Sequence, residues 1–240
     1  MQDIIQNYSD EELTYALYGL FLGDGHYRRG RIIIKHTEKQ KFYCEWLETL
    51  FKNRLTLHSR YDYEQNTTFG IRKYSSISLK VPDRLYFDDC NRCLNDDGKK
   101  IVSDYVLDHI NEMGLLFWFL DDGCLHVSFK NHKAKRFAHL CTHSFTYDEN
   151  VKIQQMFKRR FDIDVAIHTD RSGFKKHKDK IYYKLYFNAD NFRKFFNLLR
   201  PLLSYIPEEF YYKFNMQYFP NRLKNSVMFS EMYNMPLKVV

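Results

Sequence analysis

Two short apolar runs in the chain end in the same unusual way, with an aspartate followed by a glycine. The first is GLFLGDG (Gly19 to Gly25) and the second is LLFWFLDDG (Leu115 to Gly123). Each run is far shorter than the roughly 20 apolar residues that a membrane-spanning helix needs. We expect each run to form a buried helix. Because the two runs match and lie about a hundred residues apart, they predict a chain that folds as two copies of one unit.

The elements expected around each run follow the same order. In the first half the hydrophobic spacing predicts a helix over 13–22, which Ser9 caps and Gly25 ends. It then predicts a strand over 31–35, a helix over 37–52 and strands over 55–63 and 69–81, and a further helix is expected after Pro82. The second half repeats this pattern, with a helix over 112–120 that Gly123 ends, a strand over 136–142, a helix over 147–161, strands over 163–168 and 181–187, and a helix over 191–203. The sequence predicts a duplicated αββαββα unit, with halves at 1–108 and 109–240 packed as one body because no flexible linker divides them.

An aspartate at the end of a helix needs a nearby cation. The C-terminus carries the negative end of the helix dipole, so a carboxylate there costs roughly 0.3 to 1 kcal/mol. If the two helices pack side by side about a pseudo-twofold axis, Asp24 and Asp122 come together and each raises the pKa of the other unless cations lie between them. Hard oxygen ligands of this kind suit Mg²⁺.

Small residues on the first helix predict a close contact between the two helices. Residues three and four positions apart share one ridge of a helix, and aligning the copies pairs Ala16, Gly19 and Gly23 with Gly114, Phe117 and Asp121. A large Phe117 placed against Gly19 would interlock the pair. Two ordinary core helices with polar ends are the alternative, which the matched repeat disfavours.

Charge and cysteine usage narrow the class of protein. The formal net charge is +7; residues 1–108 hold 16 Lys/Arg and 17 Asp/Glu, whereas residues 109–240 hold 21 and 13. A basic, aromatic-rich chain is a candidate for binding nucleic acid or another polyanion. Five cysteines suit a reducing, intracellular setting, for which an organelle matrix such as that of mitochondria is one possibility. The pair Cys90 and Cys93 lacks a second zinc-binding pair at finger spacing.

The two apolar runs resemble a known family motif. Leu17-Tyr-Gly-Leu-Phe-Leu-Gly-Asp-Gly25 resembles the nine-residue LAGLIDADG motif, and Leu115 to Gly123 resembles its second copy in single-chain homing endonucleases of mitochondrial introns. The resemblance implies a mixed α+β fold with two pseudo-symmetric repeats, each a four-stranded antiparallel saddle-shaped sheet backed by helices. It further implies a monomer that makes a staggered double-strand cut in a long DNA target.

The resemblance also implies the site residues. Metal-binding positions are Asp24 and Asp122, together with Gly23 and Asp121 that precede them; Asp122 is preferred to Asp121 as the catalytic residue because it adjoins the glycine in both copies. Lys100 and Lys213 match the family's basic catalytic residues, with Lys99 as a rival to Lys100. The implied cofactor is Mg²⁺, with Mn²⁺ as a substitute and Ca²⁺ as an ion that supports binding without cleavage.

The implied partner is double-stranded DNA, with no membrane. We expect the wet faces of the two sheets to contact the major groove. The predicted contact residues are basic side chains and one tyrosine: Arg28, Arg29, Arg31, Lys35, Arg60, Arg72, Lys73, Lys130, Lys133, Lys135, Arg136, Arg171, Lys175, Lys176, Lys178, Lys180, Tyr182 and Lys184.

Three alternatives stay open at this stage. His36 and His143 occupy matched positions, where they either order water near the scissile phosphates or cap the next helix. The protein could instead be an RNA maturase that binds its host intron RNA, although both acidic residues are retained. A small-molecule or polyanion binder with a fortuitous motif is the third reading.

Overall fold

The computed structural model describes residues 3–68, 70–82, 85, 99–130, 133–171 and 181–214. Its N-terminal half contains helices α1 (Asp3–Asn7), α2 (Asp10–Leu22) and α3 (Lys41–Phe51), the 3₁₀ turn η1 (Glu38–Gln40), and strands β1 (His26–Arg28), β2 (Arg31–Thr37), β3 (Thr56–Thr67) and β4 (Gly70–Lys80). Its C-terminal half contains helices α4 (Asp104–His109), α5 (Glu112–Asp122), α6 (Tyr147–Phe161) and α7 (Ala189–Leu199), 3₁₀ turns η5 (Arg200–Tyr205) and η6 (Glu208–Lys213), and strands β5 (Gly123–Lys130), β6 (Lys133–Cys141), β7 (Ala166–Arg171) and β8 (Ile181–Phe187).

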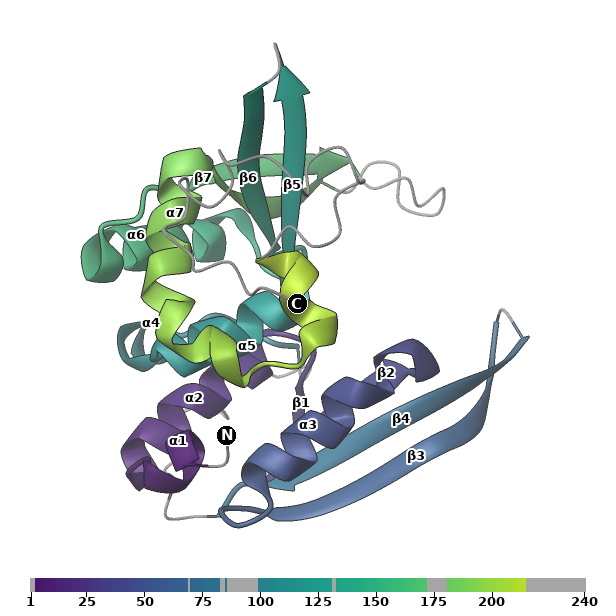
Figure 1. The fold of residues 1–240 in the computed structure, drawn as a ribbon. Coiled ribbons are helices and arrows are strands. Elements are labelled where there is room, and N and C mark those ends of the chain that lie inside the picture. Colours follow the sequence, from purple (N-terminus) through teal and green to yellow (C-terminus); the bar gives the residue numbers. More distant parts are fainter. Residues whose placement is uncertain are drawn as a thin grey trace, which may run out of the picture.

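The two sheets have the same topology. Each has four antiparallel strands, in the order β1-β2-β4-β3 in one half and β5-β6-β8-β7 in the other. Figure 1 shows α2 and α5 together in the middle of the molecule, with one sheet on either side of the pair. The duplicated α+β fold expected from the sequence is therefore confirmed.

Most predicted elements are present, with corrections at their ends. β1 and β5, which follow the two motif helices directly, were not among the predicted ranges, nor were α1 and α4. Ser9 caps α2 in a capping box with Glu12, but the helix ends at Leu22 with Gly23 as its C-cap, two residues before the predicted stop at Gly25. The helix expected after Pro82 and the pair Cys90 and Cys93 lie outside the described residues.

The strands alternate buried and exposed residues, which sets the two faces of each sheet. In β2 the residues Ile32, Ile34 and His36 are buried, whereas Lys35 is exposed. α3 covers the buried face of the N-terminal sheet in Figure 1, and α6 and α7 lie against the C-terminal sheet. The opposite face of each sheet is left open, because a helix layer on one side already buries the apolar residues.

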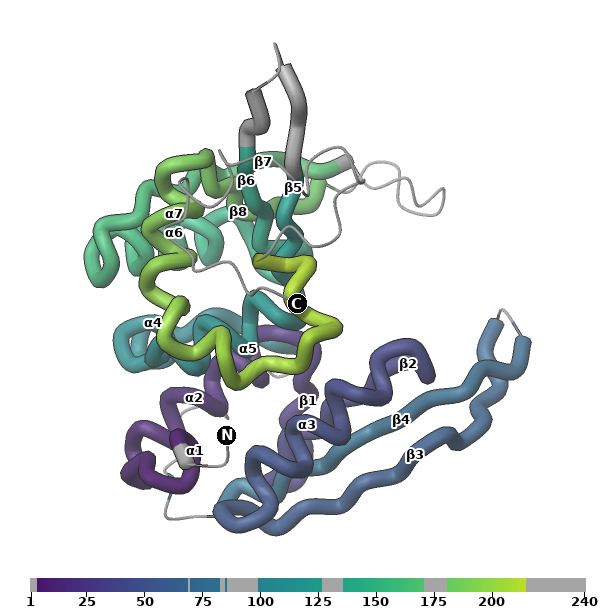
Figure 2. Tube along the Cα trace, viewed as in Figure 1, coloured from purple at the N-terminus to yellow at the C-terminus, as the bar shows by residue number. Residues whose placement is uncertain are grey.

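The chain returns to the centre between its two halves. Figure 2 follows the trace from α1 and α2 through the first sheet, back to the centre at α4 and α5, and on to the second sheet. This path is what places the two motif helices against each other rather than in separate bodies. Among the described helices, none combines the length and the apolarity that crossing a bilayer requires.

Glycines on both helices make the α2–α5 contact close. A Cβ atom added at Gly19 would lie 1.8 Å from the carbonyl oxygen of Gly114, and one added at Gly114 would lie 2.6 Å from the carbonyl oxygen of Tyr15. The suggested pairing of Phe117 with Gly19 is therefore wrong. Phe117 instead packs against Trp46 and Phe51 of α3, with ring centroids 5.8 and 5.9 Å apart. The backbones touch because glycine alone leaves room for the facing carbonyl.

We expect Gly19→Ala to destabilise the fold by about 3 kcal/mol, because the new methyl group meets main-chain atoms that cannot rotate away. Urea unfolding followed by tryptophan fluorescence measures the loss. Asn197→Ala, at an exposed position of α7, is the control and should stay within about 0.5 kcal/mol of the parent protein. Equal stability of both variants would show that the helices can separate without cost.

Candidate active site

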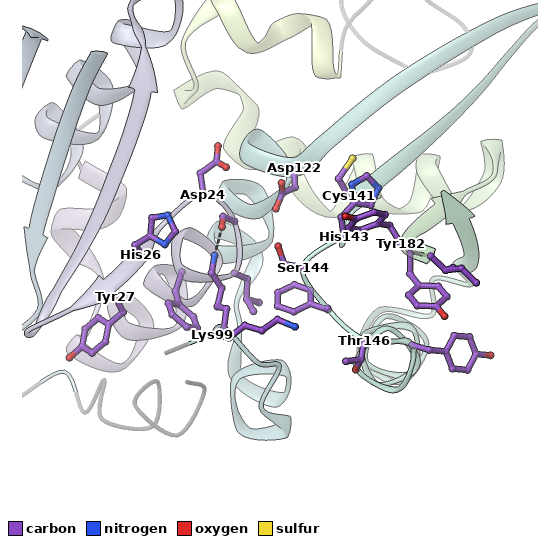
Figure 3. Close-up of a pocket in the computed structure, with 18 residues that line it drawn as sticks. Asp24, His26, Tyr27, Lys99, Asp122, Cys141, His143, Ser144, Thr146 and Tyr182 are labelled. Carbon is purple, nitrogen blue, oxygen red and sulfur yellow. Dashed lines mark hydrogen bonds between the residues drawn. The ribbon is translucent and has the colours of Figure 1, made fainter. Parts of the chain in front are cut away.

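The ends of the two motif helices open into one cleft. The cleft has a volume of about 860 Å³, and Asp24 and Asp122 both line it. Figure 3 shows their side chains from opposite halves, with Lys99 below them and His143 on the C-terminal side. The structure thus brings together the two carboxylates that the motif alignment paired.

The glycine after each aspartate is required by a tight turn of the chain. A Cβ atom at Gly25 would lie 2.3 Å from the carbonyl oxygen of Leu20, and one at Gly123 would lie 2.4 Å from the carbonyl oxygen of Phe119. The backbone therefore folds back against the last turn of its own helix before entering the first strand. This turn leaves the preceding aspartate at the helix end, facing the cleft rather than the core.

The surroundings of Asp122 oppose its ionisation. Burial and the neighbouring charge of Asp24 raise the pKa of Asp122 from 3.8 to about 7, against the opposite influence of Lys100 and Lys213. Two facing acids in a partly buried cleft repel each other in this way. A divalent cation at this position would favour the ionised form.

Two lysines hold the ends of the motif helices. Lys213 is 5% exposed, and its ammonium group donates hydrogen bonds to the carbonyl oxygens of Leu120 at 2.5 Å, Gly123 at 2.9 Å, Asp121 at 3.3 Å and Phe119 at 3.4 Å. Helices leave such carbonyls without intrahelical partners. At the second motif, the ammonium group of Lys213 therefore provides the positive charge that balances the negative end of the helix dipole.

Lys100 is the corresponding group at the first motif. Its ammonium group donates to the carbonyl oxygen of Gly23 at 2.5 Å, and it lines the cleft. Burial lowers the pKa of Lys100, while Asp122, Asp121 and Asp24 oppose that shift. Lys99 is exposed in the same cleft. The contact with Gly23 favours Lys100 over Lys99, and the catalytic roles of Lys100 and Lys213 stay predictions.

The carboxylate of Asp121 crosses the helix interface. Its Oδ2 accepts a hydrogen bond from the backbone N–H of Asp24 at 2.9 Å, and a Cβ atom at Gly23 would lie 2.2 Å from the same oxygen. Burial, followed by the charge of Asp24, raises the pKa of Asp121 well above its usual value. Sequence reasoning missed this contact, although the alignment of Asp121 with Gly23 held the signal: the missing side chain makes the space that the carboxylate fills.

The two matched histidines differ in their surroundings. His36, at the end of β2, is buried, and its Nδ1 lies 3.9 Å from Oδ2 of Asp24. His143 is more exposed, and its Nε2 lies 3.6 Å from Oδ2 of Asp170. Burial lowers the pKa of His36. The two positions are equivalent in the fold but not in chemistry.

In the N-terminal half, most of the basic residues that we predicted to contact DNA are exposed. Arg28, Arg29, Lys35, Arg60, Arg72 and Lys73 are exposed there, and Arg31 is half-buried. Arg29 and Gly30, with φ of 51° and 70°, form the two-residue turn that joins β1 to β2, so the turn projects a cation. The guanidinium of Arg60 lies 4.2 Å from the ring of Tyr63, and the ammonium of Lys35 lies 4.2 Å from the ring of Tyr74.

The predicted residues in the C-terminal half are placed less uniformly. Arg136 is 4% exposed, on the same face as Ala138 and Leu140, which is the face that the helices cover. Tyr182 and Lys184 are half-buried, and Lys184 lies 3.1 Å from Asp170. Lys175, Lys176, Lys178 and Lys180 lie outside the described residues. Lys130, Lys133, Lys135 and Arg171 are described only as parts of strands.

A row of imidazoles on the C-terminal sheet was not foreseen. The ring centroids of His126 and His139 are 4.9 Å apart, those of His139 and His168 are 6.0 Å apart, and His168 stacks on Tyr186 at 4.5 Å. Burial and the charge of Lys184 lower the pKa of His139 to about 4. Burial also lowers the pKa of His126, so the open face of this sheet carries uncharged imidazoles at His126 and His139 beside its cations. The sequence held a signal for this row: His126 and Ser128 are two residues apart, as are Phe137 and His139, and residues two apart in a strand point to the same face of the sheet.

Comparison with known proteins decides the family. A family model described as "LAGLIDADG DNA endonuclease family" matches residues 14–195, which span both motif helices and both sheets. The chain belongs to the LAGLIDADG DNA endonuclease family. The resemblance stated from the two motifs is thereby confirmed, and the chain is a DNA endonuclease of this family.

Individual relatives of this LAGLIDADG protein agree with the family. It is 27% identical over 136 residues to "Probable intron-encoded DNA endonuclease 3" of Mycosarcoma maydis, covering 57% of this chain and 87% of the relative. It is 28% identical over 216 residues to "Probable intron-encoded endonuclease 1" of Wickerhamomyces canadensis, covering 85% of this chain and 87% of the relative. A solved structure titled "The homing endonuclease I-WcaI bound to its DNA recognition sequence" shares the fold, with a TM-score of 0.65 and 19% identity over 85% of this chain and 86% of that chain.

The donor set in and beside the cleft of this LAGLIDADG protein fits a divalent metal, on which the family's chemistry depends. Asp24, His36 and Asp121 offer ligand atoms that all lie within 4.8 Å of one another. Asp122 lines the same cleft as Asp24, and the main-chain carbonyl of Gly23 already attracts an ammonium group. Oxygen donors and converging carboxylates are the chemistry that holds Mg²⁺ and similar ions.

Proposed function

We propose that the protein is a site-specific homing endonuclease that makes a staggered double-strand cut in a long DNA target by metal-dependent phosphodiester hydrolysis. The observation that carries the proposal is the meeting of Asp24 and Asp122 in one cleft at the ends of two packed helices. One carboxylate from each half provides one centre for each DNA strand. A single chain then suffices for both cuts, and the proposed enzyme acts as a monomer.

Asp24 and Asp122 would hold the metal, with main-chain oxygens at Gly23 and Asp121 as further donors. When bound, a Mg²⁺ ion lowers the pKa of a water molecule and neutralises charge on the phosphate oxygens. Mn²⁺ would substitute, and Ca²⁺ would support binding alone. Lys100 would add positive charge beside the reacting phosphate; its position in the cleft and its hydrogen bond to the carbonyl of Gly23 support this role.

The open faces of the two sheets would bind the DNA. Exposed basic side chains on the N-terminal sheet contact phosphates, which supplies affinity without sequence preference. The polar side chains between them, including the imidazoles of His126, His139 and His168, would face base edges in the major groove. We leave Arg136 out of this surface because it is buried.

Selection of cleaved sites from a randomised DNA pool tests the proposal. In Mg²⁺ we expect one family of long sites to be recovered with ends that ligate as staggered termini. In Ca²⁺ the same sites should be retained on the protein but left uncut, and retention should fall steeply as salt rises because phosphate contacts dominate affinity. Recovery of random sequences in both ions would reject site-specific cleavage.

The raised pKa of Asp122 predicts a pH-dependent release of protons when metal binds. Since the pKa is about 7, Asp122 is mostly protonated at pH 6 and must lose about one proton to bind the ion, whereas at pH 8 it is already ionised. Calorimetric titration with Mg²⁺ in two buffers of different ionisation enthalpy counts these protons. We compare the number of protons released by the parent protein with the number released by Asp122→Asn. The difference should be close to one proton at pH 6 and close to zero at pH 8. A release that does not change with pH would contradict this.

A further inference from the structure

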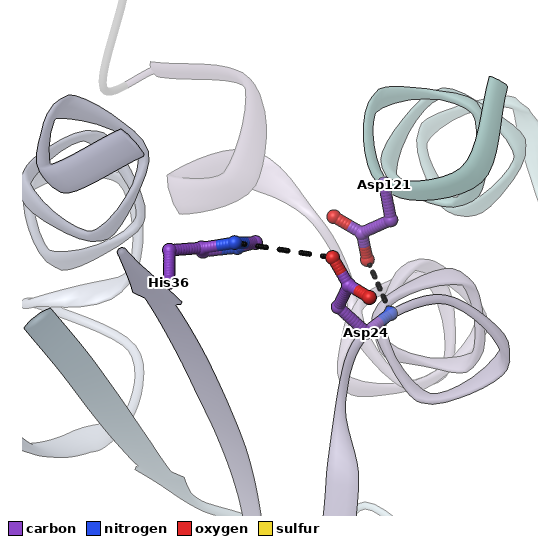
Figure 4. A group of neighbouring side chains, drawn as sticks. All are labelled: Asp24, His36 and Asp121. Carbon is purple, nitrogen blue, oxygen red and sulfur yellow. Dashed lines mark hydrogen bonds and ion pairs between the residues drawn. The ribbon is translucent and has the colours of Figure 1, made fainter. Parts of the chain in front are cut away.

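Three side chains from three separate elements converge beside the cleft in the N-terminal half. Asp24 follows α2, His36 ends β2, and Asp121 lies in the last turn of α5; Figure 4 shows the imidazole and both carboxyl groups directed toward a common point. Their ligand atoms all lie within 4.8 Å of one another. A carboxylate on its own would be unremarkable at this position, but a buried imidazole beside two acids is a different donor set.

One hydrogen bond fixes the carboxyl group of Asp121, whose Oδ2 accepts from the backbone N–H of Asp24 at 2.9 Å. Its Oδ1 is buried and has the Tyr43 hydroxyl as its side-chain neighbour, and the imidazole of His36 is buried beside Gln40. Polar atoms buried in this way need partners, because leaving them unsatisfied costs free energy. A cation between the carboxylates and the imidazole would give Oδ1 of Asp121 a further partner.

The side chain of His36 is held for such a role. It is only 4% exposed, and its Nδ1 faces Oδ2 of Asp24, which is 48% exposed and therefore open to an ion from solvent. The ring of Tyr43 lies beside it, with centroids 5.1 Å apart. A fixed neutral imidazole offers one nitrogen lone pair to an ion, and fixing a ligand before binding lowers the entropy lost on binding.

The second half does not repeat this cluster. Gly23 occupies the position that matches Asp121 and has no side chain to offer. His143 matches His36, but its Nε2 lies 3.6 Å from Asp170 on β7. The mixed donor set is therefore a property of one half alone, although the two halves share their topology.

We propose that Asp24, His36 and Asp121 form a nitrogen-containing cation site in the N-terminal half, which binds transition-series ions such as Mn²⁺ more tightly than Mg²⁺. Carboxylate oxygens suit both ions, whereas an imidazole ligand favours the transition series. The inference deepens the proposed metal-dependent cleavage, because it makes the two strand-cutting centres unequal in the ion that they prefer.

Pulsed electron paramagnetic resonance of Mn²⁺ bound to the full chain without DNA tests this site. In the parent protein we expect coupling of the Mn²⁺ spin to one imidazole nitrogen, which labelling with ¹⁵N-histidine changes to the ¹⁵N pattern. His36→Gln should abolish the coupling and weaken Mn²⁺ binding at least about tenfold, because even the loss of a residue that only orients a metal ligand costs that much. His143→Gln is the matched control from the other half and should keep both the coupling and the affinity.

Nitrogen coupling that persists in His36→Gln, or that disappears in His143→Gln, would overturn the assignment. Circular dichroism shows whether each variant is folded. If His36→Gln does not fold, the labelled parent protein still decides, because absence of nitrogen coupling there refutes an imidazole ligand. Since the measurement contains no DNA, a protein that binds Mn²⁺ through His36 but cuts no DNA would refute the proposed function and leave this site standing.

Discussion

Replacing Asp122 by asparagine is expected to reduce double-strand cleavage about 10³-fold, since loss of one group that supports charge at the reacting phosphate typically costs this much. Asparagine keeps the size of the side chain but removes the negative charge on which a divalent ion depends. Binding of the DNA target in Ca²⁺ should change little, because the exposed basic residues that we propose to contact phosphates are untouched. Plasmid linearisation in Mg²⁺ and a gel-shift assay in Ca²⁺ measure the two effects separately.

Asp24→Asn should have the same effect, because the proposed mechanism assigns one carboxylate to each DNA strand. Nicked plasmid would then accumulate with either variant, cut on opposite strands. Asp190→Asn, whose side chain is 81% exposed on α7, is the matched control and should cut as the parent protein does. Linearisation by Asp24→Asn and Asp122→Asn at the parent rate would remove both residues from the reaction.

The placement of these carboxylates could be predicted from local rules and symmetry. The Asp-Gly ending marks where a helix stops and the chain turns back, and the repeat of that ending about a hundred residues later predicts two equivalent helices. α6 and β8 have the predicted bounds, 147–161 and 181–187, because their hydrophobic periodicity is strong. The pairing of Asp24 with Asp122 follows from the same symmetry.

Contacts that break the symmetry could not be predicted in the same way. Aligning the copies pairs Gly19 with Phe117, whereas the structure pairs Gly19 with Gly114. Symmetry says which positions are equivalent, but the crossing point of two helices depends on which backbones can approach most closely. The burial of Arg136 is similar: a single strand pattern does not say which face of the sheet a charged side chain takes.

Lys213 is the residue whose role the sequence leaves most ambiguous. Its family context implies catalysis. Its placement in the fold depends on η6, because Lys213 lies 93 residues after Leu120, whose carbonyl oxygen it contacts. No local rule predicts that an ammonium group will be 5% exposed and surrounded by four carbonyls. Its hydrogen bonds are already committed to the end of α5. A structural role is therefore at least as well supported as a role at the phosphate.

Lys213→Met is expected to destabilise the protein by about 3 to 5 kcal/mol, the cost of removing one partner from a buried charged cluster. Methionine preserves the length and apolar stem of the side chain but leaves the carbonyls at the end of α5 without a donor. It also removes the positive charge that opposes the repulsion among Asp121, Asp122 and Asp24. Urea unfolding followed by tryptophan fluorescence measures the loss, since Trp118 is buried in α5.

Lys100→Met separates this structural effect from catalysis. Lys100 donates to one carbonyl and lines the cleft, so we expect about 1 kcal/mol of destabilisation but a loss of cleavage of about 10²-fold. Lys99→Met, at the adjacent exposed position, is the control and should change neither. If Lys213→Met is as stable as the parent protein and loses only cleavage, the carbonyl contacts are incidental and Lys213 acts on the phosphate. If it unfolds at lower urea, the ammonium group is part of the fold that holds Asp122 in place, and the cation that an acidic helix end requires is built into the chain.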